Sequence, residues 1–276
     1  SYNNVLDAAA ATAIARLLRG PAAVVVKHTN PCGAAERPLL LAAWHAALAG
    51  DPVSAYGGVV ALTRDVDSAV AEALTELFLE VIVAPGFDAG ARDILAGKPN
   101  LRLVLDAFLR EDEPPPQPGP TSSLRSAGGA VLVGVPDILH DDPGDWLCPT
   151  DRGPTATEFA DLDLAWRLVR GVTSNAIVLV KDRMEIGLGS GQTSRVDAAH
   201  QAVAKARAIH GEGALQGASA ASDAFFPFPD AVDVLLEAGV SAIVQPGGSI
   251  RDAEALAAVE RAHATMLLTG RRHFRH

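Results

Sequence analysis

Short continuous apolar runs alternate along the chain with longer segments whose apolar residues have helical spacing. In the first half, such runs predict strands at residues 22–26, 59–62, 81–83 and 101–105. Helices are predicted between these runs, at residues 6–18, 39–48, 65–78 and 91–95. Runs without polar alternation are typical of strands buried on both faces. The pattern therefore predicts an α/β fold with a largely parallel sheet.

The second half of the chain shows the same alternation. Its predicted strands are residues 176–180, 185–188, 242–244 and 265–268. Its predicted helices are residues 155–169, 197–209, 231–238 and 252–263, the first of which opens with a Thr155–Glu158 capping-box signature. We therefore expect two similar α/β units in tandem, although no repeat is visible in the residues themselves.

The stretch between the halves is rich in turn-forming residues. Residues 111–120 contain three consecutive prolines and are expected to form a surface loop or linker, and residues 130–134 an added strand. Residues 141–153 are rich in Asp, Pro and Gly. We place the boundary within this last stretch, which gives predicted units at residues 1–145 and 146–276.

Composition narrows the classes of function. The net charge of −10 argues against a nucleic-acid coat or a protein that binds anionic membranes, both of which are usually basic. No apolar run reaches the roughly 20 residues of a membrane span. Two cysteines in 276 residues form no disulfide framework, so we expect a reducing cytoplasm. The first residues form neither a signal nor a transit peptide and lack an initiator Met, so we expect a fragment or a processed chain.

Lys27 and His28 follow directly on a β-branched run, before a predicted Pro-Cys-Gly turn at residues 31–33. A cation and a titratable imidazole thus leave the sheet side by side. This pair suits a site in which His28 moves a proton and Lys27 stabilises developing negative charge. A solvated lysine beside a structural histidine is the plainer interpretation of the pair taken alone.

Cys32 offers a second chemistry, a thiol nucleophile with His28 as its base. Nothing in the sequence marks this thiol as prone to ionise, so a buried structural cysteine is favoured. A zinc deaminase site would need His-x-Glu together with Pro-Cys-x-x-Cys. His28 has no Glu two residues on and Cys32 has no partner cysteine, so no zinc site is expected.

Two further segments suit ligand binding. The glycine-rich stretch at residues 187–195 opens into a predicted helix, where backbone N–H groups and Arg195 are able to hold an anion. It is not a P-loop, because no Gly-Lys-Ser/Thr follows. Ser174 and Asn175 precede a strand, where they either cap it or contact an amide or hydroxyl of a ligand.

The remaining candidates lie in the last fifth of the chain. Three of the eight Phe residues fall within residues 222–230, which fits a core plug or a stack on a flat ligand beside a carboxylate. Residues 245–251 form a second glycine turn before a helix. The basic tail at residues 271–276 follows a strand directly and either extends into solvent or folds back into a site.

In order along the chain, these motifs resemble the aminoimidazole carboxamide ribonucleotide (AICAR) formyltransferase region of the AICAR transformylase/IMP cyclohydrolase family. The resemblance runs from Ser1 to His276. It rests on KHTNPCG (27–33), DPVSAYGG (51–58), EVIVAP (80–85), SNAI (174–177), GLGSGQTSRVD (187–197), ASDAFFPFPD (221–230), QPGGSIRD (245–252) and RHFRH (272–276).

The resemblance implies formyl transfer from 10-formyltetrahydrofolate, as cosubstrate, to the 5-amino group of AICAR. It implies an α/β fold of two tandem cytidine-deaminase-like units without the zinc site, and a homodimer with sites at its interface. Lys27 and His28 match the catalytic pair. The positions that hold the nucleotide are matched by Gly57, Glu80, Asn175, Arg195, Phe225, Arg272 and His276. Phe228, Asp230 and Gly247 fall on the folate side.

The chain also departs from the family pattern. An Arg-Tyr-Gly-x-Asn-Pro-His-Gln segment, which the family has upstream of Ser1, and the IMP cyclohydrolase domain lie outside this sequence. Pro229 replaces a residue that is often Arg. The family further implies a monovalent cation near the segment before Ser174. An inactive, folded nucleotide-binding remnant is therefore the alternative to an active formyltransferase, and a Cys32-dependent hydrolase is a third hypothesis.

Overall fold

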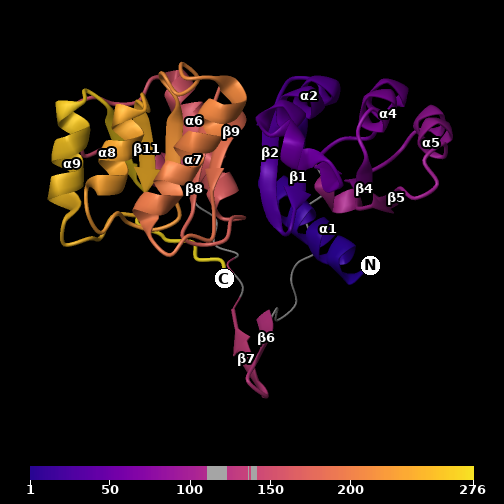
Figure 1. Cartoon of the computed structure of the whole chain (residues 1–276), viewed down its shortest axis with the longest axis horizontal. Helices are drawn as coiled ribbons and strands as arrows, with labels where there is room; N and C mark the ends of the chain where they lie inside the picture. Colours follow the sequence, from indigo (N-terminus) through magenta and orange to yellow (C-terminus); the bar gives the residue numbers. More distant parts are fainter. Residues whose placement is uncertain (111–122, 136, 138–141) are drawn as a thin grey trace.

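The computed structural model describes residues 1–110, 123–135, 137 and 142–276. Within them, one sheet has the strand order β12-β11-β10-β8-β9-β2-β1-β3-β4-β5 (Figure 1). Its strands are β1 (Ala22–Lys27), β2 (Asn30–Glu36), β3 (Gly58–Leu62), β4 (Leu79–Ala84), β5 (Arg102–Leu105), β8 (Ile177–Lys181), β9 (Met184–Gly189), β10 (Ser219–Ser222), β11 (Ala242–Gln245) and β12 (Thr265–Leu268). The chain is therefore an α/β protein.

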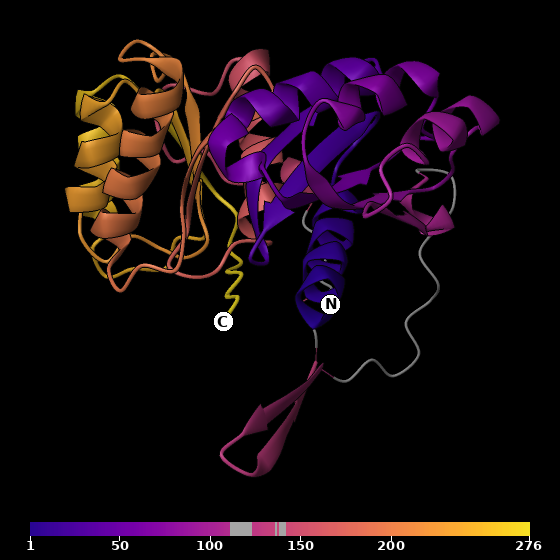
Figure 2. The ribbon, with the colours of Figure 1, turned by 45° about the vertical axis from the view of Figure 1, so that its right-hand side comes forward.

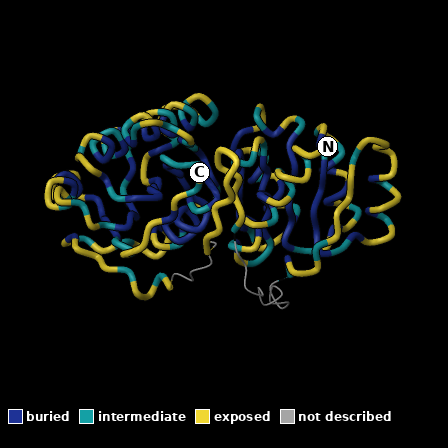
Figure 3. Tube along the Cα trace, turned by 90° about the horizontal axis from the view of Figure 1, so that it is seen from below, coloured by how far each residue is buried: buried dark blue, intermediate teal, exposed yellow. Residues whose placement is uncertain are grey.

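Helices cover both faces of this sheet. On one face lie α1 (Tyr2–Ala15) and α6 (Ala156–Val169), which share one core cluster with strand residues such as Val24 and Val178. The other face carries α2 (Leu40–Gly50), α4 (Ser68–Thr75), α5 (Ala89–Leu95), α7 (Arg195–His210), α8 (Asp230–Glu237) and α9 (Asp252–Arg261). Successive residues of β1 enter opposite clusters, which explains its continuous apolar run. Figure 3 shows that buried residues gather in the interior, with exposed residues at the periphery of the trace.

The same order of elements occurs twice along the chain. Each half runs helix, β-hairpin, helix, then three strands separated by helices, and its last three strands are parallel to one another. The residue numbers of the two hairpins differ by 154, so that the turn at residues 28–29 corresponds to the turn at residues 182–183. At this offset the repeat becomes visible: Asp7 matches Asp161 and Lys27 matches Lys181. The β-hairpin turns after both lysines have positive φ angles at two non-glycine residues.

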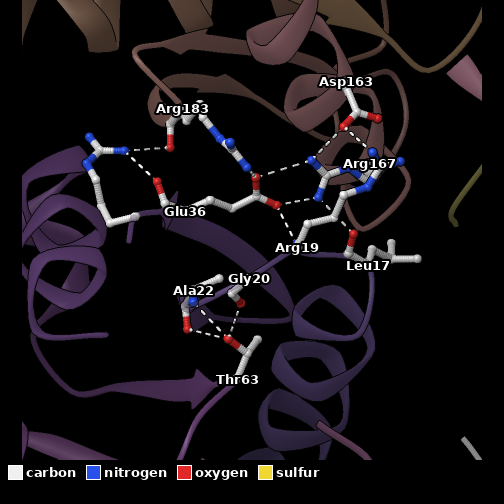
Figure 4. A network of polar contacts seen from close by, with 10 residues as sticks. Leu17, Arg19, Gly20, Ala22, Glu36, Thr63, Asp163, Arg167 and Arg183 are labelled. Atoms are coloured by element: carbon white, nitrogen blue, oxygen red, sulfur yellow. Dashed lines mark hydrogen bonds and ion pairs between the residues drawn. The ribbon is translucent and has the colours of Figure 1, made fainter. Parts of the chain in front are cut away.

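The two halves meet where β2 pairs with β9, at Ala35 and Met184. Beside this seam, the buried carboxylate of Glu36 accepts hydrogen bonds from Arg167 on α6, from Arg183 and from the backbone of Arg19 (Figure 4). Burial alone would raise the pKa of Glu36. The hydrogen bonds and charge of Arg167 outweigh it, so the pKa lies below its usual value. This network joins the first half of the chain to the second.

Several sequence predictions are wrong in detail. The sheet is mixed, because both hairpins and the pairs β1–β3, β8–β10 and β2–β9 are antiparallel. Pro31, Cys32 and Gly33 lie in β2, not in a turn, and a Cβ on Gly33 would lie 2.0 Å from the carbonyl oxygen of Ala47. Close packing against α2 therefore explains this glycine. The expected loop at residues 111–120 lies entirely outside the described residues.

A hairpin of β6 (Ser123–Ala127) and β7 (Ala130–Gly134) projects away from the body (Figure 2). The predicted strand at 130–134 is thereby confirmed. The hairpin exposes Leu124, Val131, Leu132 and Val133. The shorter elements are α3 (Pro52–Ala55), η1 (Ala107–Leu109) and η2 (Pro143–Asp145). No helix among the described residues is long and apolar enough to cross a membrane.

Candidate active site

All of the residues proposed for the site lie at one end of the strands. Because β1 is antiparallel to β3, its last residue lies beside the first residues of β3 and β4. At the same end, β8 begins and β9 to β12 finish. We call it the Lys27 end. It carries Lys27, His28, Gly57, Glu80, Asn175, Arg195, Phe225, Phe228, Asp230, Gly247, Arg272 and His276.

Lys27 and His28 stand at the tip of the β1–β2 hairpin. His28 and Thr29 are its two turn residues, with φ angles of 52° and 63°. The side chain of His28 is exposed, whereas Lys27 is half-buried and its Nζ donates to the carbonyl oxygen of Tyr56 at 2.8 Å. A free imidazole thus lies next to a fixed ammonium group, an arrangement that suits proton transfer beside developing negative charge.

Gly57 and Glu80 continue this group along the neighbouring strands. Gly57 has φ +74°, and its N–H donates to the carbonyl oxygen of Phe78 at 2.8 Å, so the turn before β3 requires glycine. The half-buried Glu80 carboxylate accepts from Arg102 at 2.8 Å and from Asn4 on α1 at 3.2 Å. Glu80 is the second residue of β4, so its carboxylate lies near the first residues of β3 and β4.

A second group of candidates lines a pocket of about 470 Å³ in the second half. Its lining includes six of the predicted residues: Asn175, Arg195, Phe225, Phe228, Asp230 and Arg272. A volume of this size suits a small-molecule ligand. The other six predicted residues, Lys27, His28, Gly57, Glu80, Gly247 and His276, are not part of its lining. The structure thus divides the predicted site into two groups at one end of the sheet.

Arg195 organises the inner wall of this pocket. It is buried, and its guanidinium group donates to the Asp223 carboxylate at 2.5 Å, to the Ser222 hydroxyl at 2.8 Å and to the Asn175 amide oxygen at 2.8 Å. Asp223 also accepts from the hydroxyl of Ser174 and from a backbone N–H. A buried charge pair with this many partners holds the Asn175 side chain in one orientation.

The outer wall of the pocket is aromatic and basic. The guanidinium of Arg251 lies 4.8 Å from the ring centre of Phe228, and that of Arg272 lies 5.2 Å from Phe274. Arg272 is exposed and so remains accessible to an anion. Of the two alternatives for the basic tail, the structure shows it folded back, because Arg275 donates to the carbonyl oxygens of Thr29 and Gly171.

Part of the glycine-rich segment has a packing role that the sequence did not indicate. A Cβ on Gly187 or Gly189 would lie 2.6 or 1.9 Å from a carbonyl oxygen of α7, so both glycines permit close packing of β9 against this helix. In the following turn, the N–H of Ser190 donates to Gln201 and that of Gly191 to Thr173. These two backbone donors are therefore already occupied, whereas Thr193, Ser194 and Val196, at the start of α7, line the pocket.

The second glycine turn is likewise occupied. The N–H groups of Gly248 and Ser249 both donate to the Asp252 carboxylate, at 2.6 and 3.2 Å. Gly247, which was expected on the folate side, has φ +74° and donates to Gln245 at 3.2 Å. The turn before α9 is thus closed by its own carboxylate.

Cys32 lacks the properties of a nucleophile. Burial, together with the negative charges of Glu185 and Asp51, raises the pKa of its thiol to about 12. The thiol contacts the carbonyl oxygen of Val25 at 3.7 Å. This geometry supports the structural interpretation of Cys32 over the hydrolase hypothesis. Across the described parts of the chain, no group of three His, Cys, Asp or Glu side chains is placed to hold a metal ion.

Three residues that position this end of the sheet were not singled out from the sequence. Asp7 binds the turn at His28, Asp223 binds Arg195, and Arg275 binds Thr29. Asp223 lay within a candidate segment without a role of its own. The only sequence signal for Asp7 is its match with Asp161 at an offset of 154, which becomes apparent once the two hairpins are superposed.

Comparisons with known proteins show the family to which the chain is similar. A family model described as the AICARFT/IMPCHase bienzyme matches residues 1–205. The bifunctional purine biosynthesis protein PurH of Anaeromyxobacter sp. (strain Fw109-5) is 45% identical over 278 residues, covering 100% of this chain and 52% of that protein. PurH of Bacillus cytotoxicus is 44% identical over 276 residues, with the same two coverages. The chain spans about half the length of the curated relatives it matches.

Proposed function

The chain belongs to the AICARFT/IMPCHase bienzyme family, and we propose that it transfers a formyl group from 10-formyltetrahydrofolate to the 5-amino group of AICAR. The product, formyl-AICAR, would serve de novo synthesis of the purine nucleotide IMP. One observation carries the proposal most directly. A free imidazole beside a lysine, and a pocket built on Arg195 and Asn175, occur at the same end of one sheet.

The proposed reaction joins the amine nitrogen of AICAR to the formyl carbon and breaks the bond from that carbon to N10 of the folate. His28 accepts the proton that the attacking amine loses, and N10 of the folate takes up a proton as it leaves. Lys27 stabilises the oxyanion that forms on the formyl group. The amine is a weak nucleophile because its lone pair is delocalised into the ring, so fixed orientation of both substrates contributes much of the rate.

We assign the pocket and the neighbouring strand ends to the two substrates. Arg272 supplies positive charge for the nucleotide phosphate and His276 a ring N–H donor, and both side chains are exposed. Asn175, held by Arg195, and the Phe225 ring contact the nucleotide, and Gly57 and Glu80 approach it from the strand ends. The folate lies against Phe228, Asp230 and Gly247.

A monovalent cation near the segment before Ser174 also belongs to this proposal. The carboxylate of Asp223 and the hydroxyl of Ser174 lie there and are oxygen ligands of the kind that hard cations take. We assign no chemical step to this ion, and we propose no zinc.

We further propose two cytidine-deaminase-like units without zinc, at residues 1–145 and 146–276. Two observations support this division. The order of helices and strands is repeated, and the two hairpins correspond at a spacing of 154 residues. The shared seam between β2 and β9 makes them halves of one sheet.

Two partners follow from the family. We propose a homodimer in which one copy supplies Lys27, His28, Gly57 and Glu80 and the other supplies the pocket of the second half. Exposed apolar side chains on the β6–β7 hairpin and on α1, such as Leu132 and Val5, are available to such an interface. Since the chain spans about half the length of its relatives, we also propose fusion to an IMP cyclohydrolase domain. We further propose a cytoplasmic location, which suits two free cysteines.

The test is formyl transfer by the chain and by His28→Ala. The expected loss in kcat is at least about 100-fold, with an unchanged unfolding midpoint, because the imidazole is exposed and supports no packing. A wild-type chain that binds AICAR in calorimetry but transfers nothing would favour the inactive remnant. Equal turnover of wild type and variant would remove His28 from the mechanism.

A further inference from the structure

We propose that Asp7, on α1, is a positioning residue for His28. The inference rests on the proposed formyl transfer for its kinetic part and on geometry alone for its structural part. Asp7 Oδ2 accepts from the backbone N–H of His28 at 3.2 Å, and Oδ1 accepts from that of Thr29 at 2.7 Å. One carboxylate therefore binds both turn residues that present the imidazole.

The turn needs such support because its conformation is unfavourable for its residues. Both His28 and Thr29 adopt positive φ angles, and Thr is β-branched, for which this region is strained. Neither residue pairs in the strand ladder, where Lys27 is opposite Asn30. Local contacts must therefore hold the turn in place.

Every backbone polar group of the two turn residues is bound by a side chain. Asp7 takes both N–H groups, the Asn30 amide donates to the His28 carbonyl oxygen at 3.2 Å, and Arg275 donates to that of Thr29 at 2.9 Å. Asn30 is fixed in turn by the N–H of Thr173 at 2.9 Å. The backbone is thus immobilised while the His28 side chain remains free.

Asp7 itself stands on a rigid element. The helix α1 is capped by the hydroxyl of Ser1 and buries Ala11 and Ile14 against the sheet. A carboxylate on a packed helix transmits the position of that helix to the turn. Residues on regular elements hold a reacting group more accurately than residues on loops do.

The second half of the chain contains the same arrangement of a helix aspartate bound to a hairpin turn, but its turn has no histidine. Asp161, on α6, accepts from the N–H groups of Asp182 at 3.0 Å and Arg183 at 2.6 Å. These turn residues also have positive φ angles, 51° and 56°, and all three positions lie 154 residues after their counterparts. This hairpin turn lies at the opposite end of the sheet. Asp161 is therefore an internal control for the structural part of the role of Asp7.

The test compares Asp7→Ala, Asp7→Asn and Asp161→Ala by steady-state formyl transfer. We expect Asp7→Ala to lower kcat by about 10- to 100-fold and to change the KM for AICAR less than about 3-fold, because orientation is lost and the nucleotide pocket is not touched. Asp7→Asn keeps one acceptor oxygen and should fall between. Asp161→Ala, which removes the equivalent bonds far from His28, should leave kcat within about 2-fold.

The pH profile of kcat separates positioning from a charge effect. If Asp7 positions the turn, the apparent pKa in the profile of Asp7→Asn stays where it is in the wild type. A displaced profile, wild-type kcat in Asp7→Ala, or equal kcat losses in Asp7→Ala and Asp161→Ala would each overturn the proposal.

A second readout does not depend on activity. Backbone amide exchange at His28 and Thr29 should be at least about 10-fold faster in Asp7→Ala than in the wild type, and unaltered in Asp161→Ala. Unchanged exchange at both amides would refute the clamp even in an active enzyme. If the wild-type chain transfers no formyl group, the proposed function fails, while the exchange result still decides the role of Asp7.

Discussion

Glu185 is a buried carboxyl group for which the structure predicts a strong pH effect on stability. It lies on β9, 3% of it is exposed, and its Oε2 has no hydrogen-bond partner. Burial, opposed by the positive charge of Lys205 and reinforced by the negative charge of Asp51, raises its pKa from 4.5 to about 8. Ionisation of this buried group costs free energy of unfolding, and the cost grows with pH. We predict that Glu185→Gln, which replaces the neutral acid by a neutral amide, removes this cost.

The sign follows from proton binding. The folded chain holds the proton of Glu185 more tightly than the unfolded chain does. The contribution of this group to the free energy of unfolding is therefore fully present below about pH 4.5 and is lost as the pH rises toward 8. At about 1.4 kcal/mol per pH unit, the carboxylate costs about 3 kcal/mol at pH 7. The free energy of unfolding of Glu185→Gln, relative to wild type, should rise by this amount between pH 4.5 and 7.

The assay is urea unfolding followed by tryptophan fluorescence at several pH values between 4.5 and 8, on both proteins. A difference between the two that stays constant across this range would refute the reasoning. It would mean that water or a rearranged Lys205 solvates the carboxylate after ionisation.

Two more predictions concern stability. Glu36→Gln should lose about 3 kcal/mol at pH 7, because buried Arg167 would keep only Asp163, at 2.9 Å, as its counter-ion. The pKa of Glu36 is lowered, so this loss of stability should shrink in urea titrations as the pH falls below 4.5, and a loss that grows in acid would contradict the prediction. Gly189→Ala should cost about 3 kcal/mol or more, since its Cβ would meet the Ala198 carbonyl oxygen at 1.9 Å. In the matched variant Gly153→Ala, the added Cβ would have no atom within 4 Å, so the melting temperature should stay nearly unchanged. Equal losses of stability in the two variants would count against close packing as the reason for Gly189.

Much of the fold follows from local pattern. The strands with branched apolar residues, such as β1 and β4, and the capping box at Thr155 and Glu158 were predictable because their cause lies within a few residues. β10 was missed because Ser219-Ala220-Ala221-Ser222 contains no large apolar side chain. Its strand conformation comes from pairing with β8 and β11, which no local pattern reveals.

Glycines and prolines misled the prediction for a related reason. Gly33 and Gly189 look like turn residues in the sequence, whereas the structure uses them where a helix backbone touches a strand. The duplication was hidden because the two halves share geometry more than residues. At the offset of 154 residues, Asp7 on α1 coincides with Asp161 on α6, and each binds the turn of its own hairpin.

The candidate site could be anticipated in part. Lys27 and His28 attract notice as polar residues directly after a buried strand, and the resemblance supplied the other positions. Pairing register then places all of them at one end of the sheet. The roles of Asp223 and Arg275 could not be predicted, because each depends on contacts more than 25 residues away.

The central claim is tested most directly by supplying the chain with AICAR and 10-formyltetrahydrofolate and following both products by mass spectrometry. The account predicts formyl-AICAR and tetrahydrofolate in equal amounts, formed at least about 100-fold more slowly with His28→Ala. Formyl-AICAR formation at the wild-type rate in His28→Ala, or wild-type chain that binds AICAR without forming formyl-AICAR, would contradict it.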